Sequence, residues 1–391
     1  MLEVGVGAER GPLGNLTNTA SGSCWTQVPP RTEKRWQRWA LVEAVRLLLP
    51  EHRAARCGEH AVPGKSPQLR RDIQGRAYYA NVRRCGSVWA CPYCAAKVGR
   101  GRVEELRRAV EAARAQGLTV TLATFTVGHR GSEPLAVLLR QLTEALRWWR
   151  GGREWVALAD AVGYVGSVRN LEVTWGERTG WHPHSHALLI TRRPFTAEET
   201  RWLQERWVRA VRRHHGYAAV GVGLKLSDSD RDVWGYLAKA ERELALAAGE
   251  DTSRSRRGWG AAEELVWSHV KRGREGRLSA WDLLRGLVAT GWSEFAERFV
   301  EFVSAFHGKR QLYWSRGLRE VLGLGREATD QELAEAEGEA EETLWTFSEV
   351  EWKRLRREGL LLVLLDVAEE GGQEAVAEFM GALMWACRSP S

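Results

Sequence analysis

Hydrophobic and polar residues follow different periods along this chain, and each change of period marks an expected element. Residues 118–127 (LTVTLATFTV) are rich in β-branched side chains and predict a strand. Residues 164–174 and 181–191 predict two strands joined by a turn, and residues 221–226 predict a further strand. Helical periodicity predicts helices at residues 35–49, 92–115, 135–149, 196–214 and 230–247. Strands and helices therefore alternate in the middle of the chain.

An adjacent strand pair within this pattern favours an α+β fold with an antiparallel sheet over a doubly wound parallel sheet. No glycine-rich phosphate loop and no dinucleotide-binding fingerprint follows a strand, which gives ATP and NAD little weight. The longest apolar run, residues 360–365, is far shorter than a membrane span. The N-terminus has no basic segment followed by an apolar one, so we expect a cytoplasmic protein that does not bind membranes.

The charge of the 391-residue chain is divided unevenly. Of its 57 basic residues only 8 are lysines, and the formal net charge is +7. Residues 321–391 hold 6 basic and 16 acidic side chains, so the excess of positive charge lies in residues 1–320. Arginine binds phosphate through two parallel hydrogen bonds, which favours a polyanionic partner such as nucleic acid. A genome rich in G and C, which encodes arginine often, would give the same composition.

Three histidines alternate within residues 181–191. His182, His184 and His186 fall on one face of the predicted strand, where imidazoles two residues apart can share a divalent metal ion. A metal ion held by histidines normally needs a further donor, and Glu172 on the preceding strand is the candidate. The alternative is that these side chains form the solvent-facing surface of the strand.

Asp232, Tyr236 and Lys239 share one face of the helix predicted at 230–247, because their spacings are four and three residues. A tyrosine hydroxyl one turn from a cation can act as a nucleophile, and a phosphate polarised by a metal ion is a suitable electrophile. The carboxylate of Asp232 can exchange protons or activate a later nucleophile. Without the histidine strand, the same residues are typical of an ordinary helix surface.

Four cysteines have the spacing of a zinc site. Cys91 and Cys94 are separated by two residues, Cys85 gives a third thiolate, and Cys57 is the expected fourth ligand, with His60 in reserve. We expect a structural Zn²⁺ here, since disulfides are rare in cytoplasmic proteins. Around these two candidate sites the chain is rich in arginine, which suits contact with a phosphate backbone. The candidate DNA-binding residues are Arg83, Arg84, Arg254, Arg256 and Arg257.

The order of these motifs resembles the replication initiators of rolling-circle plasmids, which belong to the HUH endonucleases. The resemblance rests on residues 124–126 at the end of a strand, the run from Trp181 to His186, and Tyr236 followed by Lys239. The cysteine-rich segment 85–94 and the segment 313–318 (YWSRGL) are similar to the actinobacterial type. One departure is Ser185, which stands where the family has a bulky apolar residue.

The resemblance implies a five-stranded antiparallel sheet flanked by helices. It implies that His184 and His186 bind Mg²⁺ or Mn²⁺, that Tyr236 attacks a phosphodiester at the double-strand origin, and that Lys239 orients the active site. The products are a 5′-phosphotyrosine and a 3′-OH for a polymerase to extend. Asp232 occupies the position of a glutamate that activates water at termination in some relatives. Single-stranded or hairpin origin DNA is the implied partner, together with a host polymerase and helicase.

Five regions follow from the patterns and the resemblance together. They are a flexible arm and helix at 1–50, a cysteine-rich zinc-binding segment and helix at 51–116, an HUH endonuclease core at 117–248, a helical extension at 249–320, and an acidic helical region at 321–391. Three other functions stay open: a transposase or relaxase of the same superfamily, a metal-dependent hydrolase that does not use the tyrosine, and a zinc-dependent DNA-binding regulator. The sequence does not determine the oligomeric state.

Overall fold

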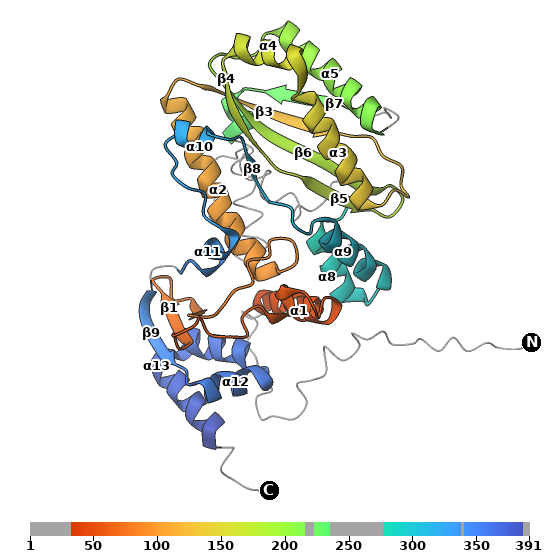
Figure 1. The fold of residues 1–391 in the computed structure, drawn as a ribbon. Helices are drawn as coiled ribbons and strands as arrows, with labels where there is room; N and C mark the ends of the chain where they lie inside the picture. Colours follow the sequence, from red (N-terminus) through yellow and green to blue (C-terminus); the bar gives the residue numbers. More distant parts are fainter. Residues whose placement is uncertain (1–32, 216–222, 235–276, 338–339, 386–391) are drawn as a thin grey trace, which may run out of the picture. The chain divides into compact units, whose positions relative to one another are not determined.

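The computed structural model describes residues 33–215, 223–234, 277–337 and 340–385 (Figure 1). The chain divides into two compact units. The terminal unit consists of residues up to 95 together with residues from 329 onward, and the central unit consists of residues 96–328. This grouping differs from the five consecutive regions expected from the sequence, since the cysteine-rich segment and the acidic C-terminal region fall in one unit.

The central unit holds a six-stranded antiparallel sheet with the strand order β7-β3-β6-β4-β8, and β5 also pairs with β6. Its strands are β3 (Thr119–Thr126), β4 (Tyr164–Arg169), β5 (Glu172–Gly176), β6 (Gly180–Thr191), β7 (Gly223–Ser227) and β8 (Tyr313–Trp314). Its helices are α2 (Pro92–Ala115, which begins before residue 96), α3 (Leu135–Trp149), α4 (Gly152–Val162), α5 (Ala197–His215), α8 (Ala280–Thr290), α9 (Ser293–Ala305) and α10 (Leu318–Val321). The predicted mixed fold with an antiparallel sheet is confirmed.

The expected number of five strands is wrong, because the sheet has six. The segment 164–174, expected as one strand, forms β4 and β5, although both keep one register against β6: Arg169 pairs with Ala187 and Glu172 pairs with His184. The short edge strand β8 was missed because two residues carry no detectable period. Helix α4 was also missed, since it begins at the second residue of the glycine pair 151–152, shortly after α3 ends at Trp149.

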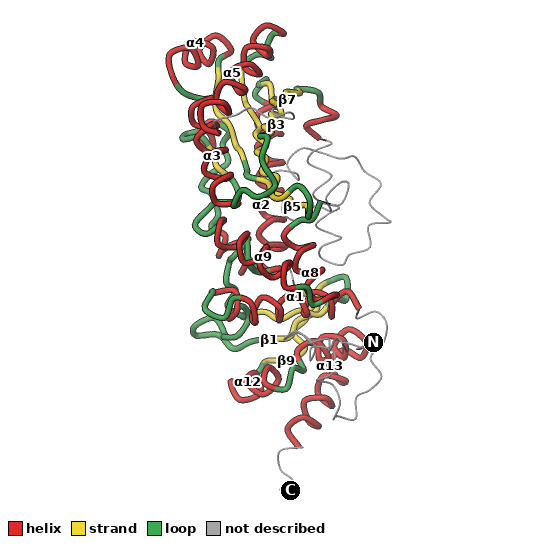
Figure 2. Tube along the Cα trace, turned by 90° about the vertical axis from the view of Figure 1, so that its right-hand side faces the viewer, coloured by secondary structure: helices red, strands yellow, loops and turns green. Residues whose placement is uncertain are grey.

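One face of this sheet, named here the helix face, is covered by α3 and α5, and α4 lies on the same side (Figure 2). Phe125 of β3 is 1% exposed and contacts the rings of Trp149 on α3 and Trp207 on α5, with centroids 4.8 and 4.9 Å apart. Edge-to-face ring pairs of this kind contribute about 0.5–1.5 kcal/mol each beyond burial. Helix α5 begins with a capping box, in which the Glu199 amide donates to Thr196 Oγ1 and the Thr196 amide donates to Glu199 Oε2.

The terminal unit has a three-stranded antiparallel sheet with the order β2-β1-β9. Its elements are α1 (Glu33–Leu48), the 3₁₀ helix η2 (Arg53–Arg56), β1 (Gln68–Asp72), β2 (Ala77–Ala80), α11 (Asp330–Glu335), β9 (Ala340–Thr346), α12 (Glu349–Arg357) and α13 (Leu361–Trp385), which is interrupted at Gly372. The sequence analysis predicted no strand at residues 51–84 or 321–391. Strands β1 and β9 are rich in charged residues, and β2 has only four residues, so the apolar alternation that marks a strand is absent.

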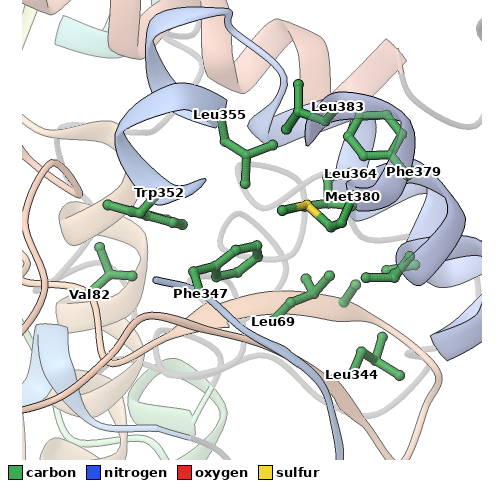
Figure 3. Close-up of a cluster of buried hydrophobic side chains, with 13 residues drawn as sticks. Leu69, Val82, Leu344, Phe347, Trp352, Leu355, Leu364, Phe379, Met380 and Leu383 are labelled. Carbon is green, nitrogen blue, oxygen red and sulfur yellow. The ribbon is translucent and has the colours of Figure 1, made fainter. Parts of the chain in front are cut away.

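A compact apolar core joins this sheet to α12 and α13 (Figure 3). Leu69 of β1, Phe347 and Leu355 are at most 1% exposed and pack with Met380 of α13. On the polar side, Arg70 forms an ion pair of 2.8 Å with Glu337, and Arg71 pairs with Glu342 on β9. The acidic stretch 330–342 therefore neutralises arginines of β1. No helix of the described residues is long and apolar enough to cross a membrane.

Candidate functional site

The predicted histidines lie on the face of the central sheet opposite the helix face. Thr124 and Thr126 flank Phe125, so their side chains point away from α3 and α5. They pair in register with His186 and His184 of β6. Glu172 of β5 pairs with His184 from the other side. This surface of β3, β6 and β5 is named here the histidine face, and it brings together the residues that the sequence selected as metal ligands.

Glu172 and His186 form a buried pair on this face. The Nε2 atom of His186 lies 2.7 Å from Glu172 Oε2, and its Nδ1 atom lies 3.1 Å from Thr124 Oγ1. Glu172 is 4% exposed and His186 is 6% exposed. A buried carboxylate without a partner would cost several kcal/mol, and the contact with His186 offsets part of that cost. The expectation that Glu172 lies beside the histidine strand is therefore met in geometry.

The strand break between β4 and β5 fixes His186 in place. Asn170 donates its backbone amide to the His186 carbonyl at 3.0 Å, and its Oδ1 atom accepts from the His186 amide at 3.0 Å. Ser185, which departs from the family pattern, is fully buried, and its hydroxyl donates to the Asn170 carbonyl at 2.6 Å. Ser185 alternates with the histidines and lies on the helix face. Its hydroxyl therefore forms its hydrogen bond on the opposite side of the sheet from the candidate ligands.

His182 pairs with a histidine that the sequence analysis did not select. His129, three residues after β3, places Nε2 2.5 Å from His182 Nδ1, while His182 Nε2 lies 2.7 Å from Thr179 Oγ1. Burial, the neighbouring His129 and the cation of Arg277 lower the pKa of His182 to about 3. Burial and Arg277 also lower the pKa of His129. A neutral imidazole is the form that binds a metal ion.

The histidine face therefore holds its donors as two pairs, Glu172 with His186 and His129 with His182. Among the described residues, only the four cysteines form a group of three or more possible ligands whose donor atoms all lie within 4.8 Å of one another. Imidazole and carboxylate donors suit divalent ions such as Mn²⁺. The donor chemistry of the histidine face thus fits such an ion.

A helix begins at Asp230, near the edge strand β7. Asp232 accepts a hydrogen bond from Ser227 Oγ at 2.5 Å. This hydrogen bond, with Ser229 and the nearby Lys225, lowers the pKa of Asp232. Lys225 pairs in register with Thr124, which is the residue that pairs with His186. Asp232 is thus held beside the strand that borders the histidine face. Tyr236 and Lys239 lie outside the described residues.

The cysteine cluster consists of Cys57, Cys85, Cys91 and Cys94, and all four are buried. Cys94 Sγ lies 3.5 Å from Cys57 Sγ and 3.6 Å from Cys85 Sγ. Four Zn–S bonds of about 2.3 Å in a tetrahedron place sulfurs roughly 3.8 Å apart, which this cluster approaches. Cys57 completes the group, whereas the His60 side chain is 67% exposed. The cluster can therefore bind a metal ion such as zinc.

Two backbone amides donate hydrogen bonds to sulfur atoms of the cluster, which favours the thiolate form. The Ser87 amide donates to Cys85 Sγ at 3.4 Å, and the Cys94 amide donates to Cys91 Sγ at 3.5 Å. The other three thiols lower the pKa of Cys57, and the Arg84 guanidinium adds to this effect.

Arg84, one of the candidate DNA-binding residues, stacks 3.9 Å over the ring of Tyr93, so its guanidinium is turned inward, while Arg83 is exposed. Of the candidate DNA-binding residues, Arg254, Arg256 and Arg257 lie outside the described residues.

Sequence reasoning missed four residues of the histidine face: His129, Asn170, Lys225 and Arg277. His129 had a usable signal, because a histidine three residues after a central strand lies near that strand's end. Lys225 becomes visible only once the register of β7 against β3 is known. Arg277 precedes Leu278, which bridges Trp175 of β5, and no sequence pattern indicates that bridge.

Comparison with known proteins finds two relatives from Streptomyces. The chain is 28% identical to "Protein rep" of Streptomyces lividans over 375 residues, which cover 78% of this chain and 79% of the relative. It is 30% identical to the "Neomycin resistance protein" of Streptomyces cyanogenus over 146 residues, which cover 31% of this chain and 33% of that relative. No family model matches the chain. No solved structure matches it either.

Proposed function

We propose that this protein is a plasmid replication initiator that nicks one strand of the double-strand origin and becomes covalently attached to it. The observation that carries the proposal is the buried Glu172–His186 pair on the central antiparallel sheet, next to His184. The similarity to "Protein rep", which extends over 78% of the chain, supports a role in plasmid replication. The basic excess of residues 1–320 suits a DNA partner.

A divalent ion bound by His184, His186 and Glu172, with His182 as a further candidate, would supply Lewis-acid polarisation of the scissile phosphate. His186 is positioned for this role by Thr124 and Asn170, which orient its ring and its backbone. Partners that fix a ligating histidine typically change metal affinity or activity by about 10–100-fold when they are removed.

The nucleophile in this proposal is Tyr236. Its hydroxyl oxygen attacks the phosphorus, the bond from phosphorus to the 3′-oxygen breaks, and the tyrosine proton ends on the released 3′-OH. The 5′-phosphotyrosine retains the phosphodiester bond, so the strand can later be rejoined without ATP. Support comes from Asp232, which is held beside β7 near the start of segment 230–247. The sequence predicts a helix for that segment, and Tyr236 and Lys239 belong to it.

The test is formation of a denaturant-resistant protein–DNA adduct. Purified protein is incubated with its supercoiled cognate plasmid, or with single-stranded circular DNA, in the presence of Mn²⁺ or Mg²⁺, and the products are separated on a denaturing gel. We expect wild-type protein to form the adduct, EDTA to abolish it, and Tyr236→Phe to lower it at least about 10³-fold, because the nucleophile is lost. Tyr78→Phe, on β2 of the terminal unit, is the matched control and should form the adduct normally.

Other outcomes would identify other functions. Cleavage without an adduct, or normal cleavage by Tyr236→Phe, would identify a metal-dependent hydrolase. Specific binding to the origin without any cleavage would identify a DNA-binding regulator. Adduct formation on transposon ends or on a transfer origin, but not on a replication origin, would identify a transposase or relaxase.

A further inference from the structure

A pocket of about 340 Å³ opens on the helix face of the central sheet. Three arginines line it: Arg147 and Arg150 at the end of α3, and Arg169 on β4. None of the described residues that line it is acidic. This composition is unusual because clustered like charges repel one another, and surface arginines elsewhere in this chain, such as Arg70, pair with carboxylates.

The charge of Arg169 is poorly compensated. Its Nε and Nη1 atoms are buried and have no hydrogen-bond partner. Its guanidinium stacks 4.2 Å over the ring of Tyr313 on β8. Burial, together with the neighbouring charges of Arg150 and Arg147, lowers the pKa of Arg169 to about 10. A buried cation held beside two others is costly unless an anion joins them.

Hydroxyl groups fix the arrangement around Arg169. Arg150 Nη1 donates to Ser167 Oγ at 3.0 Å, and the Ser167 amide donates to Ser315 Oγ at 2.9 Å. Ser315 lines the pocket and belongs to the segment 313–318, and β8 of that segment pairs Tyr313 with Arg169. Segment 313–318, which the sequence analysis noted but gave no function, therefore contributes one side of this pocket.

We propose that this pocket binds a phosphate group. Planar guanidinium groups bind phosphate oxygens through paired hydrogen bonds, and three of them without an acid suit a multiply charged anion. The pocket is separate from the histidine face, because Arg169 pairs with Ala187 and alternation places Ala187 on the opposite side of the sheet from His186. The proposal does not depend on the nicking reaction. The phosphate belongs either to a DNA backbone or to a small phosphate ester.

The first test is thermal unfolding of the full chain in inorganic phosphate and in sodium chloride at equal ionic strength. We expect saturating phosphate to raise the melting temperature of the wild type by about 2–4 °C. Arg169→Met should bind phosphate at least about tenfold more weakly, because charge-assisted hydrogen bonds are lost. In chloride alone, Arg169→Met should melt at the same or a higher temperature, because a buried uncompensated charge is removed. Arg153→Met, on an exposed arginine of α4, is the control that should keep the full phosphate shift.

A second measurement separates the two sources of phosphate. If the pocket binds the DNA backbone, Arg169→Met should reduce the salt dependence of duplex binding by about one released ion, and free phosphate should compete with duplex. If it binds a small phosphate ester, duplex binding should be unchanged and nucleoside monophosphates should raise the wild-type melting temperature. Two results would overturn the proposal. In the first, phosphate does not raise the melting temperature of the wild type, and Arg169→Met melts at a lower temperature than the wild type in chloride. That result would mean that Arg169 only packs on Tyr313. The other is an Arg169→Met variant that keeps the full shift.

Discussion

The cysteine cluster and the histidine face both gather side chains of the types that can bind a metal ion, but they are built in opposite ways. In the cluster, four thiols from a 3₁₀ helix end, a loop and the first turn of α2 converge within 4.8 Å. On the histidine face, neighbouring strands hold the donors as two separate pairs, each bonded to a threonine as well. Structural zinc sites are closed by four protein ligands, whereas catalytic sites keep a position open for a substrate.

The two groups of side chains should also differ in what they contribute: the cysteine cluster to stability and the histidine face to activity. Backbone hydrogen bonds, such as Gly58 to Arg83, already join the chain segments that carry the cysteines. The Zn²⁺ expected in the cluster would join them further, so its removal should destabilise that region. The histidine face lies on a sheet already held by strand pairing and by the aromatic contacts of Phe125. Changes there should leave the sheet folded and alter only its chemistry. The predictions below test this contrast, from the largest expected effect to the smallest: one on each group of side chains and one on an ion pair outside both.

Loss of the cluster should have the largest effect. Wild-type protein should contain one Zn²⁺ per chain by mass spectrometry, and Cys91→Ser should lose it, since one of four thiolates is missing. We expect the terminal unit to lose at least about 5 kcal/mol of unfolding free energy, because structural zinc contributes on the order of 10 kcal/mol in small domains. Chemical denaturation followed by circular dichroism measures this change.

The control for this experiment is Cys24→Ser, which alters a cysteine outside the described residues and should keep both zinc and stability. If Cys91→Ser instead unfolds at the wild-type denaturant concentration, the cluster is a set of unligated thiols. Buried free thiols behave as small apolar side chains, and such a substitution would then cost little.

A change at Glu172 should affect adduct formation strongly and stability only slightly, the reverse of the change at Cys91. We expect Glu172→Gln to lower metal-dependent adduct formation about 100-fold, because the amide keeps the shape of the side chain but loses the negative charge that a divalent ion needs. The unfolding free energy should fall by only about 1–3 kcal/mol, through the weakened contact with His186. The measurements are adduct yield against Mn²⁺ concentration and a denaturation curve.

Glu177→Gln supplies the comparison, since Glu177 is exposed in the turn between β5 and β6. It should change neither quantity. Normal adduct formation by Glu172→Gln at low Mn²⁺ would remove Glu172 from the candidate ligands.

Much of this contrast could be predicted from the sequence, because it depends on local spacing. The cysteines at 85, 91 and 94 lie within ten residues, and the three histidines alternate on one strand, so both groups appear in a linear pattern. Glu172 was predictable because a short turn between two strands places them in antiparallel register. The helices at 92–115 and 135–149 follow the helical period over their whole length.

The remaining features depend on contacts between distant segments. Strand β9 pairs with β1 across more than half of the chain, and its residues 340–346 contain no apolar alternation that would mark a strand. His129 reaches His182 only through the register of β3 against β6. The arginine pocket combines α3, β4 and β8, and each arginine alone is indistinguishable from a solvated surface residue.

The smallest effect is expected at Arg193 and Glu199, which belong neither to the cysteine cluster nor to the histidine face. Arg193 donates to both carboxylate oxygens of Glu199, at 2.7 and 2.9 Å, and this hydrogen bonding lowers the pKa of Glu199 to about 2. Because the folded-state pKa is below the unfolded value, the stabilisation is fully present above about pH 4.5 and is lost as the pH falls through about 2.

Glu199→Gln should therefore cost about 0.5–1 kcal/mol at pH 7, an amount typical of a partly exposed ion pair and cap. It should also flatten the decline in stability between about pH 4.5 and 2, as measured by denaturation at a series of pH values. Adduct formation and zinc content should stay at wild-type levels, because Glu199 caps the start of α5 and belongs to neither group of candidate ligands. A Glu199→Gln variant that lost adduct formation would show that the sheet's chemistry depends on its general stability, and the contrast between the two groups of ligands would then fail.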